Sequence, residues 1–391
     1  NLITSRKMRK IEANFHVKVS LGIISYMGTW PPQGNYRTIY LFYEILTFVF
    51  ILGIYLIVQS VYLIVVWGNV EKMVAGAFLL MTNTSHALKV FNIFWRQNRI
   101  QALLDVVENG QFSRYNSEYE RILASYALKG IFHHVAYQSL ATVAVFCWGF
   151  TPIADLISGH SRRLPMEGWY PYNVTETPAF ELTCVHQALA AVIACFQNIG
   201  MDTLVTGLIT VACCQLEILK SNLRLIGNES LISPNNVDVE LKNCVEHHIA
   251  IINFTREIEA IFSTTIIVQF LVNCIIICLT AFHITKMTEF VLAELIGMTM
   301  YMCCMTYQIF IYCWHGNEVA LQSESVVFAA YAGNWWRCGE RYKRGLRLLM
   351  ARAKEPLTLK AGNLLTLSLQ TFVTILRASY SFFTVLQSST N

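Results

Sequence analysis

Seven long apolar runs are the feature that most constrains how this chain can fold. Six of them are strongly apolar and cover residues 40–67, 73–94, 131–150, 182–216, 260–282 and 290–314. A seventh, more polar run covers residues 364–386. Because a helix needs about 20 mostly apolar residues to cross a bilayer, each run predicts one membrane span. Only 14% of the residues are charged, which also favours a membrane protein.

These spans predict the fold class and the domain organisation. We expect an all-α membrane protein in which residues 1–391 form a single seven-helix domain. The chain contains no Gly-Ser or Pro-rich linker, no internal repeat and no low-complexity tract that would divide it. The run over residues 182–216 is longer than a bilayer is thick, so its helix is expected to project into the cytosol.

Basic residues are distributed unevenly between the two sides of the spans. Of the 29 Lys and Arg residues, 23 fall in loops on the N-terminal side. The opposite side holds Lys72, Arg162, Arg163 and Lys286. Because Lys and Arg are enriched in cytosolic loops, the N-terminus is predicted to be cytosolic. After an odd number of spans, the C-terminus is then predicted to be extracellular.

One glycosylation sequon falls on the predicted outer side. Asn173, Val174 and Thr175 form an Asn-X-Thr sequence in the second outer loop. We therefore expect a glycan at Asn173, since such sequons are modified on the outer surface of secretory-pathway proteins.

The sequence contains no spacing typical of a catalytic, cofactor or metal site. Most of the 12 cysteines fall in or beside apolar runs, where they are expected to pack as small hydrophobic residues. His133-His134 and the segment from Cys244 to His248 lack acidic partners at catalytic spacing. We therefore expect no enzyme activity, no cofactor, no metal and no nucleic-acid partner.

Three classes of seven-helix membrane protein are consistent with this pattern: a channel, a metabotropic receptor and a transporter. The inverted orientation speaks against a G-protein-coupled receptor, as does the absence of an acidic-Arg-Tyr motif from residues 131–150. The absence of internal repeats and broken helices speaks against a transporter.

The last run carries a polar stripe. Its members recur at spacings of four and three residues: Gln370, Thr374, Arg377, Ser381, Thr384 and Ser388. This spacing places them on one face of a helix. In a bilayer, such a face must meet protein or water. The stripe therefore predicts either a pore enclosed by several subunits or a polar seam packed within the same chain.

The stripe is part of a longer C-terminal pattern. It begins at Pro356, includes Ala361-Gly362, and continues through residues 367–386. This pattern resembles the C-terminal signature of insect odorant receptors. Weaker similarities occur upstream, at residues 28–31, 202–204, 247–270 and 312–335. Gln370 and Arg377 stand where many members of the family carry Glu and Lys.

The resemblance implies a fold and an activity beyond what the residues show. Four subunits would surround one pore, each contributing its seventh helix, and cytosolic segments 217–259 and 315–363 would form an anchor where the subunits meet. The second cytosolic loop, residues 217–259, is shorter than that of the family's co-receptor. This length favours a tuning receptor. Such a receptor is expected to form a heterotetramer with the co-receptor in the plasma membrane of olfactory neurons. It would pass cations without a G protein. A gustatory-type receptor channel is the related alternative, although its typical C-terminal ending is absent.

The resemblance also assigns roles to individual residues. Val385 matches the hydrophobic position that narrows the closed pore, and Thr384, Ser388 and Ser389 would line its outer end. Ser381 and Arg377 belong to the same stripe, with Arg377 facing another subunit or lipid headgroups. The family places the odorant pocket among helices two, three, four and six. Candidate pocket residues are Met73, Ala77, Leu80, Tyr137, Ala141, Ala144, Trp148, Gln187, Ala191, Met298 and Tyr301.

The chemistry of these candidates predicts the class of ligand. They are apolar or aromatic apart from the amide of Gln187, and none carries a charge. Since burying an unpaired charge is very costly, the ligand is expected to be a small, neutral, mainly apolar volatile. Methionine and aromatic walls further favour a ring-bearing ligand.

Overall fold

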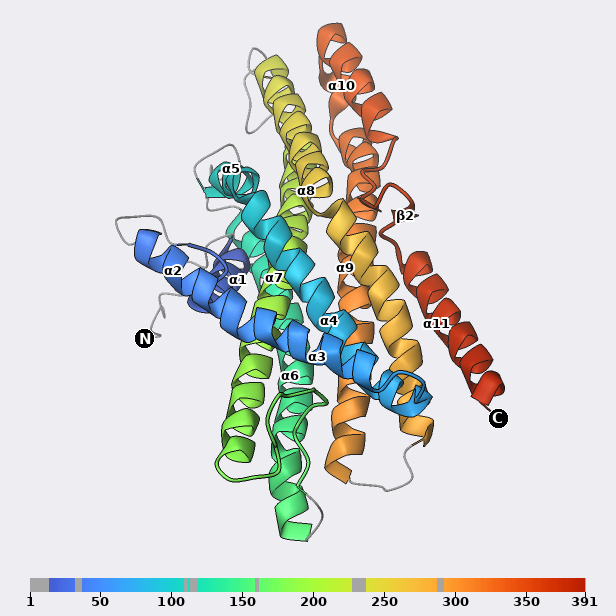
Figure 1. Cartoon of the computed structure of the whole chain (residues 1–391). Coiled ribbons are helices and arrows are strands. Elements are labelled where there is room, and N and C mark those ends of the chain that lie inside the picture. The colour runs from blue at the N-terminus through green and yellow to red at the C-terminus, as the bar shows by residue number, and fades with distance from the viewer. Residues whose placement is uncertain are drawn as a thin grey trace, which may run out of the picture.

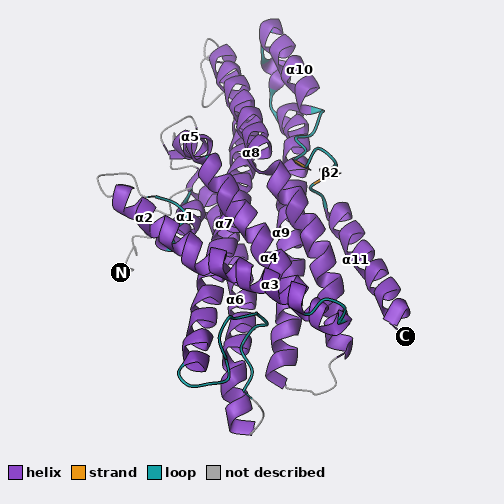
Figure 2. Ribbon diagram, viewed as in Figure 1, coloured by secondary structure: helices purple, strands orange, loops and turns teal. Residues whose placement is uncertain are grey.

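The computed structural model describes residues 14–31, 37–108, 112, 119–158, 162–226, 237–286 and 292–390. The described elements are α1 (Phe15–Tyr26), α2 (Arg37–Thr47), the π-helical η1 (Phe48–Gly53), α3 (Ile54–Val65), α4 (Val70–Trp95), α5 (Gln97–Glu108), α6 (Glu120–Ser158), α7 (Ala179–Leu225), α8 (Val237–Lys286), α9 (Leu292–Ala332), the 3-10 helix η4 (Trp335–Arg337), α10 (Glu340–Ala353), β1 (Lys360–Ala361), β2 (Leu365–Thr366) and α11 (Leu369–Thr390). The predicted all-α class is confirmed, and one short strand pair is the exception within the described residues (Figures 1 and 2).

Four of the described helices, α6, α7, α8 and α9, are long and apolar enough to cross a membrane by length and composition. The first apolar run folds as α2, η1 and α3 in direct succession. A turn at Gly68, whose φ of 93° suits glycine, separates this helix from α4. The side chain of Asn69 then caps α4, because its Oδ1 accepts a hydrogen bond from the Lys72 N–H at 3.1 Å.

Helix α7 forms the centre of the bundle. Every residue from Ile199 to Leu216 is buried, because neighbouring helices surround this part of α7. It packs against α1, α6, α8 and α9. With 47 residues, α7 is about 70 Å long, more than twice the hydrocarbon thickness of a bilayer. The predicted extension of this helix beyond a single span is therefore present.

Helix α1 was not anticipated from the hydropathy pattern, because it is short. It lies across α7 (Figure 1). The ring of His16 hydrogen-bonds the Gly207 carbonyl at 3.1 Å, and the Ser20 and Thr203 hydroxyls lie 2.9 Å apart. A Cβ at Gly200 would lie 2.6 Å from Ile24, so glycine allows the close crossing of the two helices.

A tight hairpin delivers the chain into the last helix. β1 pairs antiparallel with β2, and Gly362 and Asn363 between them have φ values of 60° and 57°. The hairpin docks on α8, where the Gly362 N–H donates to the Ser263 carbonyl at 3.0 Å. The predicted seventh helical run, residues 364–386, is therefore corrected: the helix begins at Leu369, because residues 365–366 pair as a strand.

At one end of the molecule, α10 and the beginning of α8 project beyond the remaining helices (Figure 1). α10 packs against α8 and α9 through the buried side chains of Tyr342, Leu346 and Leu349. These elements belong to segments 217–259 and 315–363, for which the family resemblance implies a cytosolic anchor. Residues 227–236 of this region lie outside the described residues.

Candidate functional site

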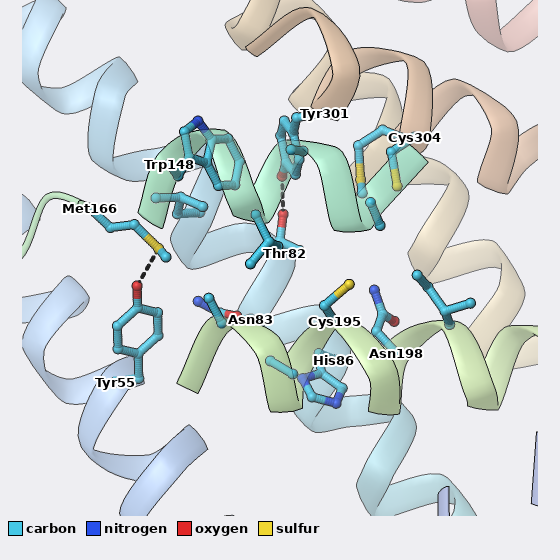
Figure 3. A pocket seen from close by; sticks show the side chains of 18 of the residues that line it. Tyr55, Thr82, Asn83, His86, Trp148, Met166, Cys195, Asn198, Tyr301 and Cys304 are labelled. Atoms are coloured by element: carbon cyan, nitrogen blue, oxygen red, sulfur yellow. Dashed lines mark hydrogen bonds between the residues drawn. The ribbon is translucent and has the colours of Figure 1, made fainter. Parts of the chain in front are cut away.

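A cavity of about 90 Å³, counted as space open to the centre of a water-sized sphere, lies among α3, α4, α6, α7 and α9. This is several times the volume of about 10–15 Å³ that one water molecule needs. Figure 3 shows side chains from these helices converging on it. The lining residues are Tyr55, Leu79, Thr82, Asn83, His86, Tyr137, Ala141, Ala144, Val145, Trp148, Met166, Ala191, Ala194, Cys195, Asn198, Ile199, Tyr301, Cys304 and Met305. The cavity therefore has an apolar wall with a few polar groups, the usual composition of a small-molecule site.

The structure brings six of the predicted pocket residues to this cavity. They are Tyr137, Ala141, Ala144, Trp148, Ala191 and Tyr301. They come from three helices that are far apart in sequence, and Trp148 and Tyr301 contact each other with ring centroids 5.1 Å apart. These residues form one wall of the cavity.

Five predicted pocket residues do not line the cavity. Met73, Ala77 and Leu80 lie on α4 but on a different face from the lining residues Leu79, Thr82, Asn83 and His86. Met298 is buried elsewhere, on the first turns of α9. The face of α4 that lines the cavity carries the polar residues Thr82, Asn83 and His86. Hydropathy alone therefore did not identify it as a buried face.

Gln187 has a structural role instead. Its amide donates to the Met166 carbonyl and accepts from the Met166 N–H, both at 3.0 Å. It also donates to the Tyr170 hydroxyl at 3.0 Å. The side chain is fully buried and holds the loop between α6 and α7 against the bundle. Met166, which the sequence analysis missed because it lies in a loop, is thereby placed in the cavity wall.

Two further polar contacts tie the cavity walls together. The Thr82 hydroxyl hydrogen-bonds the Tyr301 hydroxyl, which joins α4 to α9. The Tyr55 hydroxyl donates to the Met166 sulfur at 2.5 Å, which joins α3 to the loop (Figure 3). Because these groups are already paired, most of the polar atoms around the cavity need no ligand partner.

A buried ion pair lies directly beside the cavity. The Lys89 ammonium donates to the Asp202 carboxylate at 2.6 Å, and their side chains are only 4% and 1% exposed. Lys89 also donates to the Oδ1 atom of Asn198, a lining residue, at 2.7 Å. Asp202 accepts further hydrogen bonds from the hydroxyls of Tyr137 and Tyr312, at 3.2 and 2.8 Å. The carboxylate is therefore fully compensated, as a buried charge must be.

The ion pair continues into an amide network between α8 and α9. Gln308 donates to Asp202 at 2.5 Å and accepts from Gln269 at 3.0 Å and from Asn273 at 2.8 Å. The next residue, Cys274, contacts Ser379 of α11, with 3.3 Å between hydroxyl oxygen and sulfur. A continuous set of contacts therefore runs from the cavity to the last helix.

Helix α11 packs on α8 and α9 through one face only. Ile375 and Ser379 are buried in this contact, and Phe372 lies edge-on to Phe310 of α9. All six residues of the polar stripe are exposed: Gln370, Thr374, Arg377, Ser381, Thr384 and Ser388. Val385 is 65% exposed on the same helix. The stripe therefore does not form a seam packed within this chain. Ser389 lies in α11, but its side chain lies outside the described residues.

Asn173 is exposed in the loop before α7. Its Oδ1 accepts hydrogen bonds from the Thr175 N–H and hydroxyl, at 3.1 and 2.8 Å. The amide is therefore on the surface, where a glycosylating enzyme can reach it. Glycosylation of Asn173 remains a prediction.

Three histidines of the two sequence clusters, His133, His134 and His247, have hydrogen-bond partners within the protein. His133 and His134 hydrogen-bond Tyr307 and Thr203, each at 2.9 Å. His247 hydrogen-bonds Gln215 at 2.9 Å, and burial lowers the pKa of His247 to about 4. Within the described residues, no cluster of His, Cys, Asp and Glu is arranged to hold a metal ion.

Comparison with known proteins decides the family. Residues 69–380 match the model of the family described as 7tm Odorant receptor, which covers most of the chain. The chain belongs to the insect odorant receptor family. Odorant receptors are membrane receptors rather than enzymes, and the seven-transmembrane description agrees with the seven spans predicted for this chain.

Relatives and solved structures of odorant receptors resemble the chain over nearly its full length. Odorant receptor Or1 of Anopheles gambiae is 24% identical, and the alignment covers 93% of each chain. Odorant receptor 46a, isoform A, of Drosophila melanogaster is 28% identical over 81% of this chain and 82% of its own. The insect olfactory receptor OR5 of Machilis hrabei, solved with eugenol, has the same fold: the TM-score is 0.83 at 18% identity, over 95% and 97% of the two chains.

Proposed function

We propose that this odorant receptor is the tuning subunit of an odorant-gated, non-selective cation channel. The observation that carries the proposal is the polar stripe on α11, which is exposed along the helix while the opposite face packs on α8 and α9. A polar surface inside a bilayer needs water or protein. A single helix cannot enclose water, so several copies of α11 around an axis would satisfy the stripe.

The assembly in this proposal is a heterotetramer with the odorant receptor co-receptor. The segments that project beyond the bundle, α10 and the beginning of α8, would form the anchor between subunits. Val385 would narrow the closed pore, because a ring of apolar side chains excludes water. Arg377 would face a neighbouring subunit or lipid headgroups, since its side chain is exposed.

The orientation in this proposal follows the distribution of basic residues. The N-terminus and the anchor would be cytosolic, and the C-terminus and the loop that carries Asn173 would be outside the plasma membrane. The 23 basic residues on the N-terminal side, against 4 on the other, support this arrangement.

The proposed ligand is a small, neutral volatile held in the cavity among α3, α4, α6, α7 and α9. Walls of Trp148, Tyr301 and Met166 favour a ring-bearing molecule through stacking and sulfur contacts. The related receptor solved with eugenol supports a ligand of this size and shape. Because so small a molecule buries little area, its affinity is expected to be modest.

Whole-cell recording tests the proposal. The chain expressed with a co-receptor in cells that lack G-protein signalling should give a volatile-evoked cation current within the time of solution exchange. The chain expressed alone should give little current, because the proposed pore needs both kinds of subunit. A response that appears only when G proteins are restored would contradict the channel and favour a metabotropic receptor.

Cysteine accessibility tests the pore face and the orientation together. Cysteine substitutions of Ser381, Thr384 and Ser388 should each allow a charged, membrane-impermeant thiol reagent, applied outside, to reduce the evoked current by more than half. Ile375→Cys is the matched control, because Ile375 is only 7% exposed and packs on α8 and α9. The unmodified chain controls for its native cysteines. Equal inhibition at Ile375 and at the stripe would refute a stripe-lined pore.

A further inference from the structure

One polar side chain in the cavity wall has no partner. His86 is 1% exposed and lines the cavity, yet neither Nδ1 nor Nε2 of its ring has a hydrogen-bond partner. Among the described lining residues, it is the one with a buried polar side-chain atom left unpaired in this way. Leaving such atoms unpaired costs stability, so an unpaired group at a binding site indicates a partner that arrives with the ligand.

The neighbouring polar groups pair with residues other than His86. Thr82 hydrogen-bonds Tyr301, and the Asn83 amide donates to Gln59 at 2.9 Å. Asn198, on the facing helix, accepts from Lys89, and Lys89 is committed to Asp202. His86 therefore lies between the mainly apolar cavity and an ion pair that is already hydrogen-bonded. A ligand in the cavity can supply the missing hydrogen bond.

The chemistry of a buried imidazole determines what it can bind. A charged ring without a counter-ion would be costly here, and Lys89 on the next turn of α4 is already positive, so the ring is neutral. A neutral imidazole has one N–H donor and one acceptor nitrogen. A hydroxyl can satisfy either atom, an ether or carbonyl oxygen can satisfy only the donor, and a hydrocarbon can satisfy neither.

We propose that His86 is a specificity-determining residue of the odorant site, and that it selects ring-bearing volatiles with a hydroxyl group over hydrocarbons of the same shape. This inference rests on the proposed function only in taking the cavity as the ligand site. Binding at His86 and opening of the pore are separate events, so they can be measured separately.

Three isosteric probes test the selection: benzyl alcohol, anisole and ethylbenzene. They share one ring and the same number of heavy atoms, and they differ in hydrogen-bonding capacity. Binding to the purified receptor in lipid nanodiscs is followed by quenching of tryptophan fluorescence, since Trp148 lines the cavity. Trp148→Phe identifies the part of the signal that comes from this site.

Benzyl alcohol should bind about tenfold more tightly than ethylbenzene, with anisole between them, because only the oxygen-bearing probes pair the buried ring. His86→Leu should remove this order, and His86→Gln should restore part of it, since an amide also offers a donor and an acceptor. Met305→Leu, a volume-conserving change elsewhere in the wall, should shift the three probes equally.

Equal binding of benzyl alcohol and ethylbenzene to the unmodified receptor would overturn the inference, as would an order that survives in His86→Leu. The proposed function has a different readout. Selective binding without current would retain the role of His86 and refute the channel. Current with no selectivity among the probes would retain the channel and refute the role of His86.

Discussion

Replacing Ala144 by Trp is expected to abolish the volatile-evoked current while the receptor still reaches the cell surface. Ala144 is 2% exposed and lines the cavity with its methyl group. An indole at this position would fill the cavity, so no ligand could enter. The strain of the added ring is expected to lie within the usual cost of overpacking, about 1–3 kcal/mol.

The adjacent residue provides the control for this substitution. Val143 is 40% exposed and points away from the cavity, so Val143→Trp adds the same bulk to the outer surface of α6. Its response should be close to that of the unmodified receptor. Surface biotinylation measures delivery of both variants, and whole-cell recording measures their response to the same volatile. A normal response from Ala144→Trp would show that the ligand binds elsewhere.

Replacing Lys89 by Met is expected to destabilise the whole receptor. The substitution keeps most of the side-chain volume but leaves the Asp202 carboxylate, 1% exposed, without its cation. Breaking a buried pair in this way typically costs about 3–5 kcal/mol. The melting temperature of the detergent-solubilised receptor, followed by fluorescence-detected size-exclusion chromatography, should fall by several degrees, and surface expression should fall with it.

A second substitution separates the lost charge from the lost side chain. Adding Asp202→Asn to Lys89→Met removes the uncompensated carboxylate while an amide oxygen can still accept from Tyr137 or Tyr312. The double variant should therefore be more stable than Lys89→Met alone. A Lys89→Met receptor with unchanged melting temperature would show that the pair contributes little to stability.

The all-α class was predictable because the apolar runs are long. The extension of α7 followed from its length alone, and the polar spacing on α11 defined the face that the structure leaves exposed. The hairpin before α11 was harder to predict. It depends on the left-handed conformations of Gly362 and Asn363 and on a docking contact with Ser263, none of which alters the hydropathy pattern.

The cavity was only partly predictable. The family resemblance indicated which helices surround the pocket, and the candidates on α6 and Ala191 on α7 line the cavity, whereas those on α4 lie on the wrong face of that helix. Residues Thr82, Asn83 and His86 would ordinarily be expected to face a polar environment. Thr82 and Asn83 have partners on other helices, Tyr301 and Gln59, whereas His86 is buried without one. The pairing of Lys89 with Asp202 joins residues that are distant in sequence, so a single chain offers no local signal for it.

The loop that ends at α7 has a consequence for the timing of responses. Gln187 fastens Met166 to α7 through both backbone groups, while the Tyr55 hydroxyl and the Val58 carbonyl fasten Met166 and Trp169 to α3. A volatile that leaves the proposed site past this loop would do so after these attachments release. Departure past the loop would then be governed by a motion of the protein that is the same for every ligand. Responses to strong and weak odorants would then decay at similar rates after the odorant is removed. The duration of a response would be set by the loop and not by the affinity of the ligand.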